Sequence, residues 1–331
     1  MYFNNCSKQN KIHCIGGKNV KKYGFGVDIG GTTIKMGFFE TTGNLLDKWE
    51  IKTDTTDGGS NILSDIAKSI DNKLAQESIS KDEVAGVGVG VPGPVRGESV
   101  VNRCVNLGWG VFDVAEELSA LTGLSVKVGN DANVAALGEM WQGGAKGSTD
   151  VVMVTLGTGV GGGIIIDGKI VGGFHGAGGE IGHLTVNKEE MEACNCGKYG
   201  CLEQYGSATG VVRLAKRKLA KTSDETALRK YDNLTAKDVF DEAKANDTIA
   251  LEIVDEVGEI LGSSIADIAA VVNPEVIVIG GGVSKAGDIL ISAIQEHFVE
   301  NCFHAVRDTK FVIATLGNDA GIYGCVRMVI E

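Results

Sequence analysis

The residues with the most distinctive chemistry lie close together between positions 173 and 203. One histidine and three cysteines occur there at short spacing, as His183, Cys194, Cys196 and Cys201. One imidazole nitrogen and three thiolate sulfurs make a complete tetrahedral ligand set for Zn²⁺, with no position left open for a substrate. The spacing therefore predicts a structural zinc ion, and a cluster of reduced thiols is the alternative.

Two glutamates flank these ligands, Glu180 in the sequence GEIGH and Glu203 in the sequence CLE. A loop fixed by a metal ion would hold both carboxylates rigidly beside it. The stretch is therefore a candidate wall of a substrate-binding site as well as a metal site.

Two loops have the composition of phosphate-binding turns, one over 28–33 and one over 157–159. Their residues are Asp28, Gly30, Gly31, Thr32 and Thr33 in the first loop, and Gly157, Thr158 and Gly159 in the second. Backbone N–H groups in such turns bind phosphate oxygens, and a carboxylate at the strand end can lie near a phosphate-bound Mg²⁺, usually through water. An ordinary hairpin is the alternative for one loop alone. Two such loops favour a nucleotide bound between two domains.

The pair Asn130-Asp131 follows a predicted strand over 125–128. A carboxylate at this place could accept the proton of a substrate hydroxyl while the asparagine orients that hydroxyl. An Asn-Asp helix cap is the alternative, and it is favoured when the pair is considered alone. A further glycine cluster at Gly281-Gly282 follows a buried strand over 275–279, where a flat ligand or a tight turn would fit equally well.

Composition excludes several classes of protein. The chain has 331 residues and a net charge of −12, which argues against a nucleic-acid partner. Basic residues between 213 and 221 fit a solvated helix face better than a nucleic-acid stripe. The apolar runs are too short to cross a bilayer. Residues 1–22 have no apolar core of a secretory signal, so we expect a loose extension on a cytoplasmic protein.

Strands and helices alternate along the chain, which predicts an α/β fold. Strands are predicted over 23–27, 36–39, 84–91, 125–128, 150–156, 164–166, 275–279 and 310–314. Helices are predicted over 60–76, 112–121, 133–141, 248–272, 288–298 and 319–330, with further helical segments within 207–247. The order strand, glycine turn, strand occurs near 23–39 and again near 150–166, which suggests two related domains that face each other.

With the sequences DIGGTT, GEIGH and CxCx4CLE in this order, the chain resembles the ROK family of repressors, uncharacterised reading frames and sugar kinases. The resemblance runs from Tyr23 to the C-terminus and is strongest to members that phosphorylate glucose with ATP. It implies a duplicated actin-like (ribonuclease-H-like) fold with sugar and nucleotide in the cleft between the domains. The smaller domain would comprise 23–132 with 316–331, and the larger one, 133–315, would carry the zinc loop.

The resemblance also implies roles for single residues. Asp131 would be the catalytic base for the 6-hydroxyl of the sugar, and His183 would serve both the sugar and the zinc ion through its two nitrogens. The sugar-contacting positions would be Asn106, Asn130, Asp131, Glu180, His183 and Glu203. The loops at 28–33 and 157–159 would bind the phosphates of ATP, and Gly281 and Gly282 its adenosine.

The sequence thus predicts a kinase that moves the γ-phosphoryl group of Mg·ATP to a hexose, with glucose expected first. The same chemistry on N-acetylmannosamine or fructose stays open, because specificity depends on a few hydroxyl contacts. A non-catalytic sugar sensor and an actin-like or chaperone-type ATPase are rivals from other classes. The roughly 22 residues before the first strand are too few for the helix-turn-helix domain of repressor members. The resemblance implies a dimer or tetramer.

Overall fold

The computed structural model describes residues 21–330, so residues 1–20 of the extension predicted over 1–22 lie outside the described residues. Lys22, which the sequence places in that extension, is instead part of the fold. Its backbone N–H donates to the carbonyl of Glu83 at 2.7 Å, and its own carbonyl accepts from the N–H of Thr41 at 2.8 Å.

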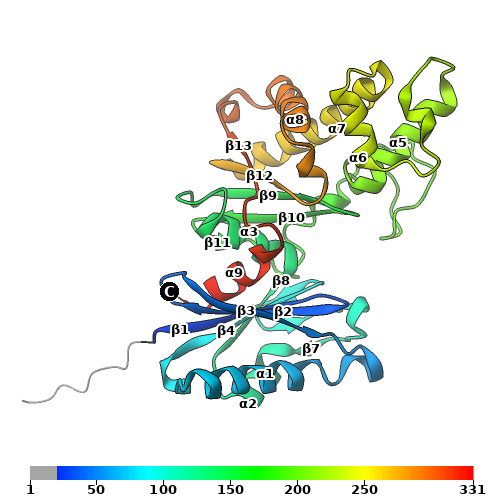
Figure 1. Ribbon diagram of the computed structural model, residues 1–331. Coiled ribbons are helices and arrows are strands. Elements are labelled where there is room, and N and C mark those ends of the chain that lie inside the picture. The colour runs from blue at the N-terminus through cyan, green and yellow to red at the C-terminus, as the bar shows by residue number, and fades with distance from the viewer. Residues whose placement is uncertain (1–20, 331) are drawn as a thin grey trace, which may run out of the picture.

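The first half of the chain forms a five-stranded sheet in the order β3-β2-β1-β4-β8. Strand β2 pairs antiparallel with both of its neighbours, β1 and β3, whereas β1, β4 and β8 run parallel. Helices α1 and α2 cover its outer face (Figure 1). The bounds are Tyr23–Ile29 for β1, Thr33–Glu40 for β2, Leu45–Lys52 for β3, Val84–Val91 for β4, Val126–Asn130 for β8, Ile62–Glu77 for α1 and Val114–Thr122 for α2.

The second half repeats this topology in a sheet of order β11-β10-β9-β12-β13. Strand β10 is antiparallel to both of its neighbours, β11 and β9, and β9, β12 and β13 run parallel, as in the first sheet. The bounds are Val151–Leu156 for β9, Val160–Ile166 for β10, Lys169–Ile170 for β11, Val276–Gly280 for β12 and Lys310–Ile313 for β13. The prediction of a duplicated α/β fold is therefore confirmed.

The helices of the second half pack mainly on the outer face of this sheet, where α7 and α8 lie against β9 and β12. Their bounds are Glu203–Gly206 for α4, Ala208–Lys221 for α5, Ala236–Lys244 for α6, Thr248–Val272 for α7 and Asp288–Asn301 for α8. Two more helices, Asp131–Gln142 (α3) and Ala320–Arg327 (α9), lie between the two sheets (Figure 1).

Glycines let α9 lie directly on the first sheet. A Cβ atom on Gly26 of β1 would stand 2.0 Å from the carbonyl oxygen of Ile322, and one on Gly88 of β4 would stand 1.7 Å from that of Cys325. No side chain fits in such a gap, so glycine is required wherever the helix backbone touches the strands.

Several element boundaries differ from those predicted. The helix predicted over 133–141 begins at Asp131. The helix predicted over 112–121 begins at Val114, because Phe112–Asp113 forms β7 of a small sheet with Val95–Arg96 (β5) and Val100–Val101 (β6). The last helix ends at Arg327 instead of 330.

The turn after β9 is shorter than predicted, because the return strand was expected to begin only at 164. Strand β10 begins at Val160, so Gly161 to Gly163 are strand residues and the turn is confined to 157–159. Their small size is needed for packing, since a Cβ atom on Gly163 would stand 2.5 Å from Cβ of Ala136 on α3. Strand β3 was not predicted, because it is largely exposed and has little apolar periodicity.

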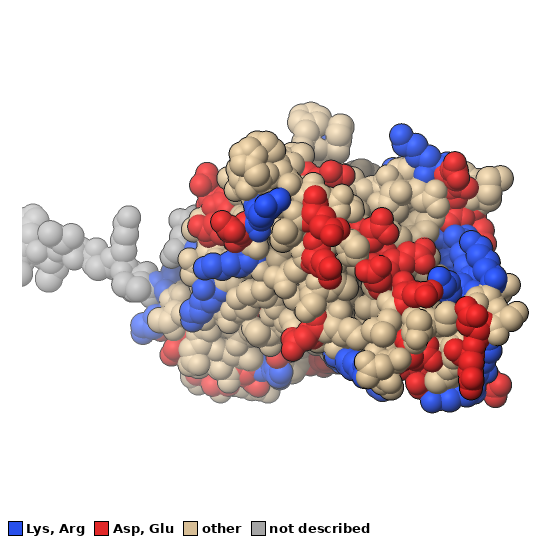
Figure 2. Space-filling model, turned by 90° about the horizontal axis from the view of Figure 1, so that it is seen from above, with Lys and Arg blue, Asp and Glu red and all other residues tan. Residues whose placement is uncertain are grey.

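Charged side chains of both signs are interspersed over the face in Figure 2. Within residues 21–330, no helix combines the length and the apolarity that a bilayer span needs. The predicted domain boundary at 132/133 falls inside α3, and the division of the chain into domains remains a prediction, as does the cytoplasmic location.

Candidate active site

A cavity of about 1110 Å³ lies between the two halves of the molecule and receives residues from both; we call it the main cavity. It brings together most of the residues that the sequence predicted for substrate and nucleotide. Among them are Asp28, Gly30, Gly31, Asn106, Asn130, Asp131, Gly157, Gly159, Glu180, His183, Glu203, Gly281 and Gly282. Three predicted residues, Thr32, Thr33 and Thr158, are not part of its lining.

Asp131 stands at the junction of β8 and α3, as the first residue of the helix. The N-cap is Asn130, whose Oδ1 accepts from the backbone N–H groups of Ala132 at 3.0 Å and Asn133 at 3.1 Å. Asp131 Oδ1 accepts from the N–H of Ala132 at 2.8 Å and from Asn130 Nδ2 at 3.0 Å. The cap that the sequence offered as an alternative is therefore present, and it directs the aspartate into the cavity.

Carboxylates crowd this part of the cavity. Burial among protein atoms raises the pKa of Asp131, and the negative charge of Glu180 adds to the increase. Burial and the charge of Asp131 raise the pKa of Asp28 to about 6, against the opposing influence of Lys35. Such a site favours a bound cation or a transferable proton, because either one reduces the repulsion between the carboxylates.

The two predicted phosphate loops are tight turns at matching places in the two sheets. In the first, the N–H of Gly30 donates to the carbonyl of Thr33 at 3.0 Å. In the second, the N–H of Gly157 donates to the carbonyl of Gly159 at 3.0 Å. Each turn joins the first two strands of its sheet, so the duplication places the loops opposite each other across the main cavity.

His183 lies between the two glutamates that the sequence singled out. Its Nε2 is 4.0 Å from Glu180 Oε2, and its Nδ1 is 3.9 Å from Glu203 Oε1. Nδ1 is buried and has no hydrogen-bond partner. A buried nitrogen without a partner is costly, so this atom is a candidate metal ligand.

The three cysteines complete the arrangement around this nitrogen. One ligand atom from each of His183, Cys194, Cys196 and Cys201 lies within 4.8 Å of the others. The thiol of Cys194 donates to Glu203 Oε1 at 2.8 Å, and the Sγ atoms of Cys196 and Cys201 are 3.6 Å apart. Burial and the hydrogen bond to Glu203 raise the pKa of Cys194 to about 12. The donor set fits a tetrahedral thiophilic cation.

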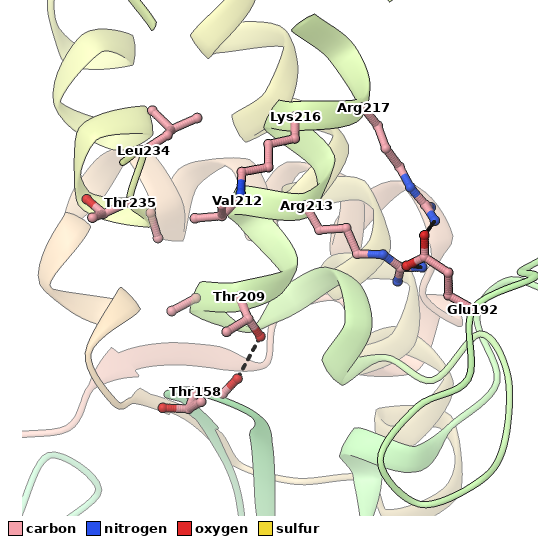
Figure 3. A pocket seen from close by; sticks show the side chains of 11 residues that line it. Thr158, Glu192, Thr209, Val212, Arg213, Lys216, Arg217, Leu234 and Thr235 are labelled. Carbon is pink, nitrogen blue, oxygen red and sulfur yellow. Dashed lines mark hydrogen bonds and ion pairs between the residues drawn. The ribbon is translucent and has the colours of Figure 1, made fainter. Parts of the chain in front are cut away.

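A second cavity of about 690 Å³ lies beside the loop at 157–159 (Figure 3). Helix α5 forms one side, with Val212 and Lys216, and Leu234 and Thr235 form the other. Thr158 lines this cavity instead of the main one. The lining combines an apolar floor with a basic rim.

Comparisons with known proteins match this geometry. The model of the ROK family matches residues 24–331. The chain belongs to the ROK family. It is 48% identical over 304 residues to a glucokinase of Halalkalibacterium halodurans, covering 90% of this chain and 92% of that one.

Solved structures of ROK proteins share the fold. A ROK glucokinase of Streptomyces griseus, in complex with glucose and AMPPNP, superposes with a TM-score of 0.70 at 32% identity, covering 92% of this chain and 98% of that one. A ROK hexokinase of Thermus thermophilus gives a TM-score of 0.74 at 28% identity, with 92% and 96% covered. The actin-like sugar-kinase fold is thereby confirmed for this ROK protein.

One polar network of this ROK protein was missed by sequence reasoning. Glu190, whose side chain is buried, accepts from both terminal nitrogens of Arg217 at 3.0 Å and from the hydroxyl of Tyr205 at 2.5 Å. Arg213 lies 2.8 Å from the same carboxylate and also 2.8 Å from Glu192. The hydrogen bonds from Arg217 hold the pKa of Glu190 far below its usual range.

This network ties the cysteine loop to helix α5, so the interpretation of a solvated basic face is wrong for both arginines (Figure 3). The sequence signal was present, as two arginines one helical turn apart and two glutamates close to the cysteines. The pairing itself depends on the tertiary position of the loop.

Proposed function

We propose that this ROK protein is an ATP-dependent hexose kinase that transfers the γ-phosphoryl group of ATP to the 6-hydroxyl of glucose. The observation that carries the proposal is that one cavity contains Asp131, the glycine loops at 28–33 and 157–159, and the wall formed by Glu180 and Glu203. The glucokinase relatives, one of them solved with glucose and AMPPNP, support the same activity.

In this proposal Asp131 accepts the proton of the 6-hydroxyl as the oxygen attacks phosphorus. The hydrogen bonds from Asn130 and Ala132 fix one carboxylate oxygen, so the orientation of the group is set before the sugar arrives. Phosphoryl transfer proceeds through a loose transition state, so positioning contributes more than strong basicity. The raised pKa of Asp131 brings it nearer to working pH, which favours general-base catalysis.

The opposite side of the cavity would hold the nucleotide. Backbone N–H groups of the two glycine loops would bind phosphate oxygens, with Thr32, Thr33 and Thr158 shaping the loops, and Gly281 and Gly282 would lie against the adenosine. Asp28 would face the Mg²⁺ that accompanies ATP. Burial and the negative charge of Asp131 raise the pKa of Asp28, and a divalent cation beside these carboxylates would reduce their repulsion.

The sugar would be bound by Glu180, His183, Glu203, Asn106 and Asn130. Carboxylates accept from sugar hydroxyls, and with Nδ1 of His183 bound to zinc, its Nε2, which faces Glu180, carries the proton and would donate to a sugar oxygen. Asn130 uses its oxygen as the helix cap, and its amide N–H groups donate to Asp131 at 3.0 Å and to the carbonyl of Gly93 at 3.3 Å, so a sugar hydroxyl would replace the longer bond to Gly93.

We propose that His183, Cys194, Cys196 and Cys201 hold a structural Zn²⁺. The buried Nδ1 of His183 without a hydrogen-bond partner and the clustered sulfurs support this choice. When bound, the ion would supply structural cross-linking only, because four protein ligands leave no position for a substrate. The ligand Cys201, two residues before Glu203, would then hold that glutamate at a fixed distance from the sugar.

A panel of sugars tested with ATP decides the function. ADP formation is measured with glucose, fructose and N-acetylmannosamine, and we expect the highest kcat/KM with glucose. A preference for another hexose would keep the chemistry and change the substrate. Sugar binding without ADP formation would favour a sensor, and ADP formation independent of sugar would favour an ATPase. A dimer or tetramer, measured by light scattering, remains a prediction from the family resemblance.

A further inference from the structure

Two short segments lie at the ends of the helices between the sheets, and we call them the crossing segments. One crossing segment, residues 143–145, follows α3, and the other, residues 314–316, precedes α9. The side chain of Glu139 on α3 contacts both of them. Glu139 is fully buried, with 0% of its surface exposed.

Three backbone N–H groups bind this carboxylate. Oε2 accepts from Gly144 at 2.8 Å and from Thr315 at 3.0 Å, and Oε1 accepts from Leu316 at 2.8 Å. A buried carboxylate is expensive unless it is fully hydrogen-bonded. Here the compensation comes from two segments that are about 170 residues apart in sequence.

The crossing segments also touch each other directly. A Cβ atom on Gly144 would stand 2.5 Å from the carbonyl oxygen of Ile313, and one on Gly143 would stand 2.0 Å from Glu139 Oε2. Backbone therefore meets backbone at this point, with the carboxylate between them.

Helices α3 and α9 continue this contact away from the carboxylate. A Cβ atom on Gly138 would stand 2.2 Å from the carbonyl oxygen of Ala320, and one on Gly324 would stand 1.6 Å from that of Val134. The two helices that lie between the sheets are thus packed at the closest distance that glycine allows.

The position of the second crossing segment matters for the main cavity. Residues on both sides of it line that cavity, namely Ile313, Ala314, Gly317, Asn318, Ala320 and Gly321. Asp131 lies on the same helix as Glu139, eight residues earlier, or about 12 Å along the axis. Glu139 thus connects the helix that carries Asp131 with the part of the cavity wall formed by 313–321.

We propose that Glu139 is a positioning residue that joins the two crossing segments and thereby sets the cavity wall at 313–321 relative to Asp131. Only an ionised carboxylate suits this place, since it accepts at both oxygens. In Glu139→Gln the side chain keeps its size, but its NH₂ group must face at least one backbone N–H, whichever way the amide is turned. The effect on turnover rests on the proposed kinase function, whereas the structural effect does not.

The test measures amide hydrogen exchange and kinetics for Glu139→Gln. Leaving a buried donor unpaired costs about 1–3 kcal/mol, so we expect exchange at Gly144, Thr315 and Leu316 to become about 5- to 150-fold faster. We expect kcat to fall about tenfold or more, with a smaller change in the KM for glucose, because the sugar wall at Glu180 is not displaced.

Ile294→Ala is the control. Ile294 is buried on α8, in a hydrophobic core of the second half to which neither crossing segment contributes, and removing its side chain weakens the fold by a cavity at another place. We expect this variant to lower the melting temperature while local exchange at 314–316 and kcat stay close to wild type at 25 °C. If it reproduces the changes seen in Glu139→Gln, a general loss of stability explains them and the proposal is wrong.

Two further outcomes decide the matter. Wild-type exchange and wild-type kcat in Glu139→Gln would overturn the proposal. If that variant does not fold, Glu139→Asp is used instead. Its carboxylate is kept, but the side chain is one methylene shorter and so lies farther from the backbone N–H groups. We expect faster exchange at Thr315 and Leu316 in this variant as well. Unchanged exchange in Glu139→Asp would also overturn the proposal. Because exchange needs no substrate, it decides the positioning role even if no hexose is phosphorylated.

Discussion

Replacing Asp131 by alanine removes the carboxylate that we propose as the base for the sugar hydroxyl. General-base catalysis contributes about 10²–10⁴-fold to a rate, which corresponds to about 2.7–5.4 kcal/mol of transition-state stabilisation. We expect kcat to fall within that range. Affinity for glucose should stay close to wild type, because Glu180, His183 and Glu203, which also line the main cavity, are unchanged.

The same substitution should not weaken the fold. The cap of α3 is the side chain of Asn130, which keeps both of its backbone partners. The pKa of Asp131 is raised in the folded state by burial and by Glu180, so its ionised form destabilises the fold above the unfolded-state pKa. Removing the charge at pH 7.5 should leave the melting temperature equal or slightly higher.

Asp113→Ala is the control. Asp113 is also an aspartate at a helix start, but its ionised carboxylate stabilises the fold, whereas that of Asp131 destabilises it. It caps α2 by accepting from the N–H of Glu116 at 2.8 Å, and a hydrogen bond from Ser99 lowers its pKa. Its loss should cost about 1 kcal/mol of stability and leave kcat unchanged.

The assay couples ADP formation to an absorbance change, calorimetry measures glucose binding, and scanning fluorimetry measures melting. A folded Asp131→Ala protein that keeps kcat within tenfold of wild type would refute the role of the base. A melting temperature that falls as much as in Asp113→Ala would refute the electrostatic argument.

Three further predictions follow from the described contacts. Cys196→Ser should lose bound zinc, raise the KM for glucose and lower the melting temperature; metal analysis that finds no zinc in the wild-type protein would contradict the proposed site. Asp28→Asn should melt higher than wild type at pH 8, because burial raises the folded pKa of Asp28 to about 6; that advantage should shrink as the pH falls from 6 towards 4, where the folded wild-type carboxyl binds a proton, and a pH-independent difference would argue against the raised pKa. Gly88→Ala should cost at least about 2 kcal/mol in a urea titration, because its Cβ would stand 1.7 Å from the carbonyl of Cys325, whereas Gly110→Ala, with no neighbour within 4 Å of its Cβ, should be close to neutral; equal costs would contradict the packing argument.

Sequence reasoning succeeded where burial imposes a simple pattern. Strand β4 is buried along most of its length, so Val84–Val91 is an apolar run, in which valines alternate with glycines over its second half. Helix α7 buries one side for seven turns, so Thr248–Val272 has a long apolar periodicity. Strand β3, Leu45–Lys52, has no fully buried residue; only Leu45, Trp49 and Ile51 are partly buried, and Asp47 interrupts their alternation.

Polar groups with structural roles could not be predicted in the same way. Glu139 and Glu190 are both buried, and each is held by partners that come from other elements or loops. In sequence they resemble the surface glutamates of any amphipathic segment. Their burial becomes visible only when tertiary packing brings backbone N–H groups or arginines to them, because pairing alone makes a buried carboxylate acceptable.

The Asn130-Asp131 pair shows why two interpretations of one motif need not compete. As a helix cap, Asn130 ends β8 and starts α3, which makes Asp131 the first helical residue and directs it into the main cavity. The cap also leaves the Asn130 amide free to donate to Asp131 at 3.0 Å, which fixes the carboxylate. A base with a set orientation requires such a junction. The capping preference that argued against a catalytic role in the sequence is therefore the structural condition for that role.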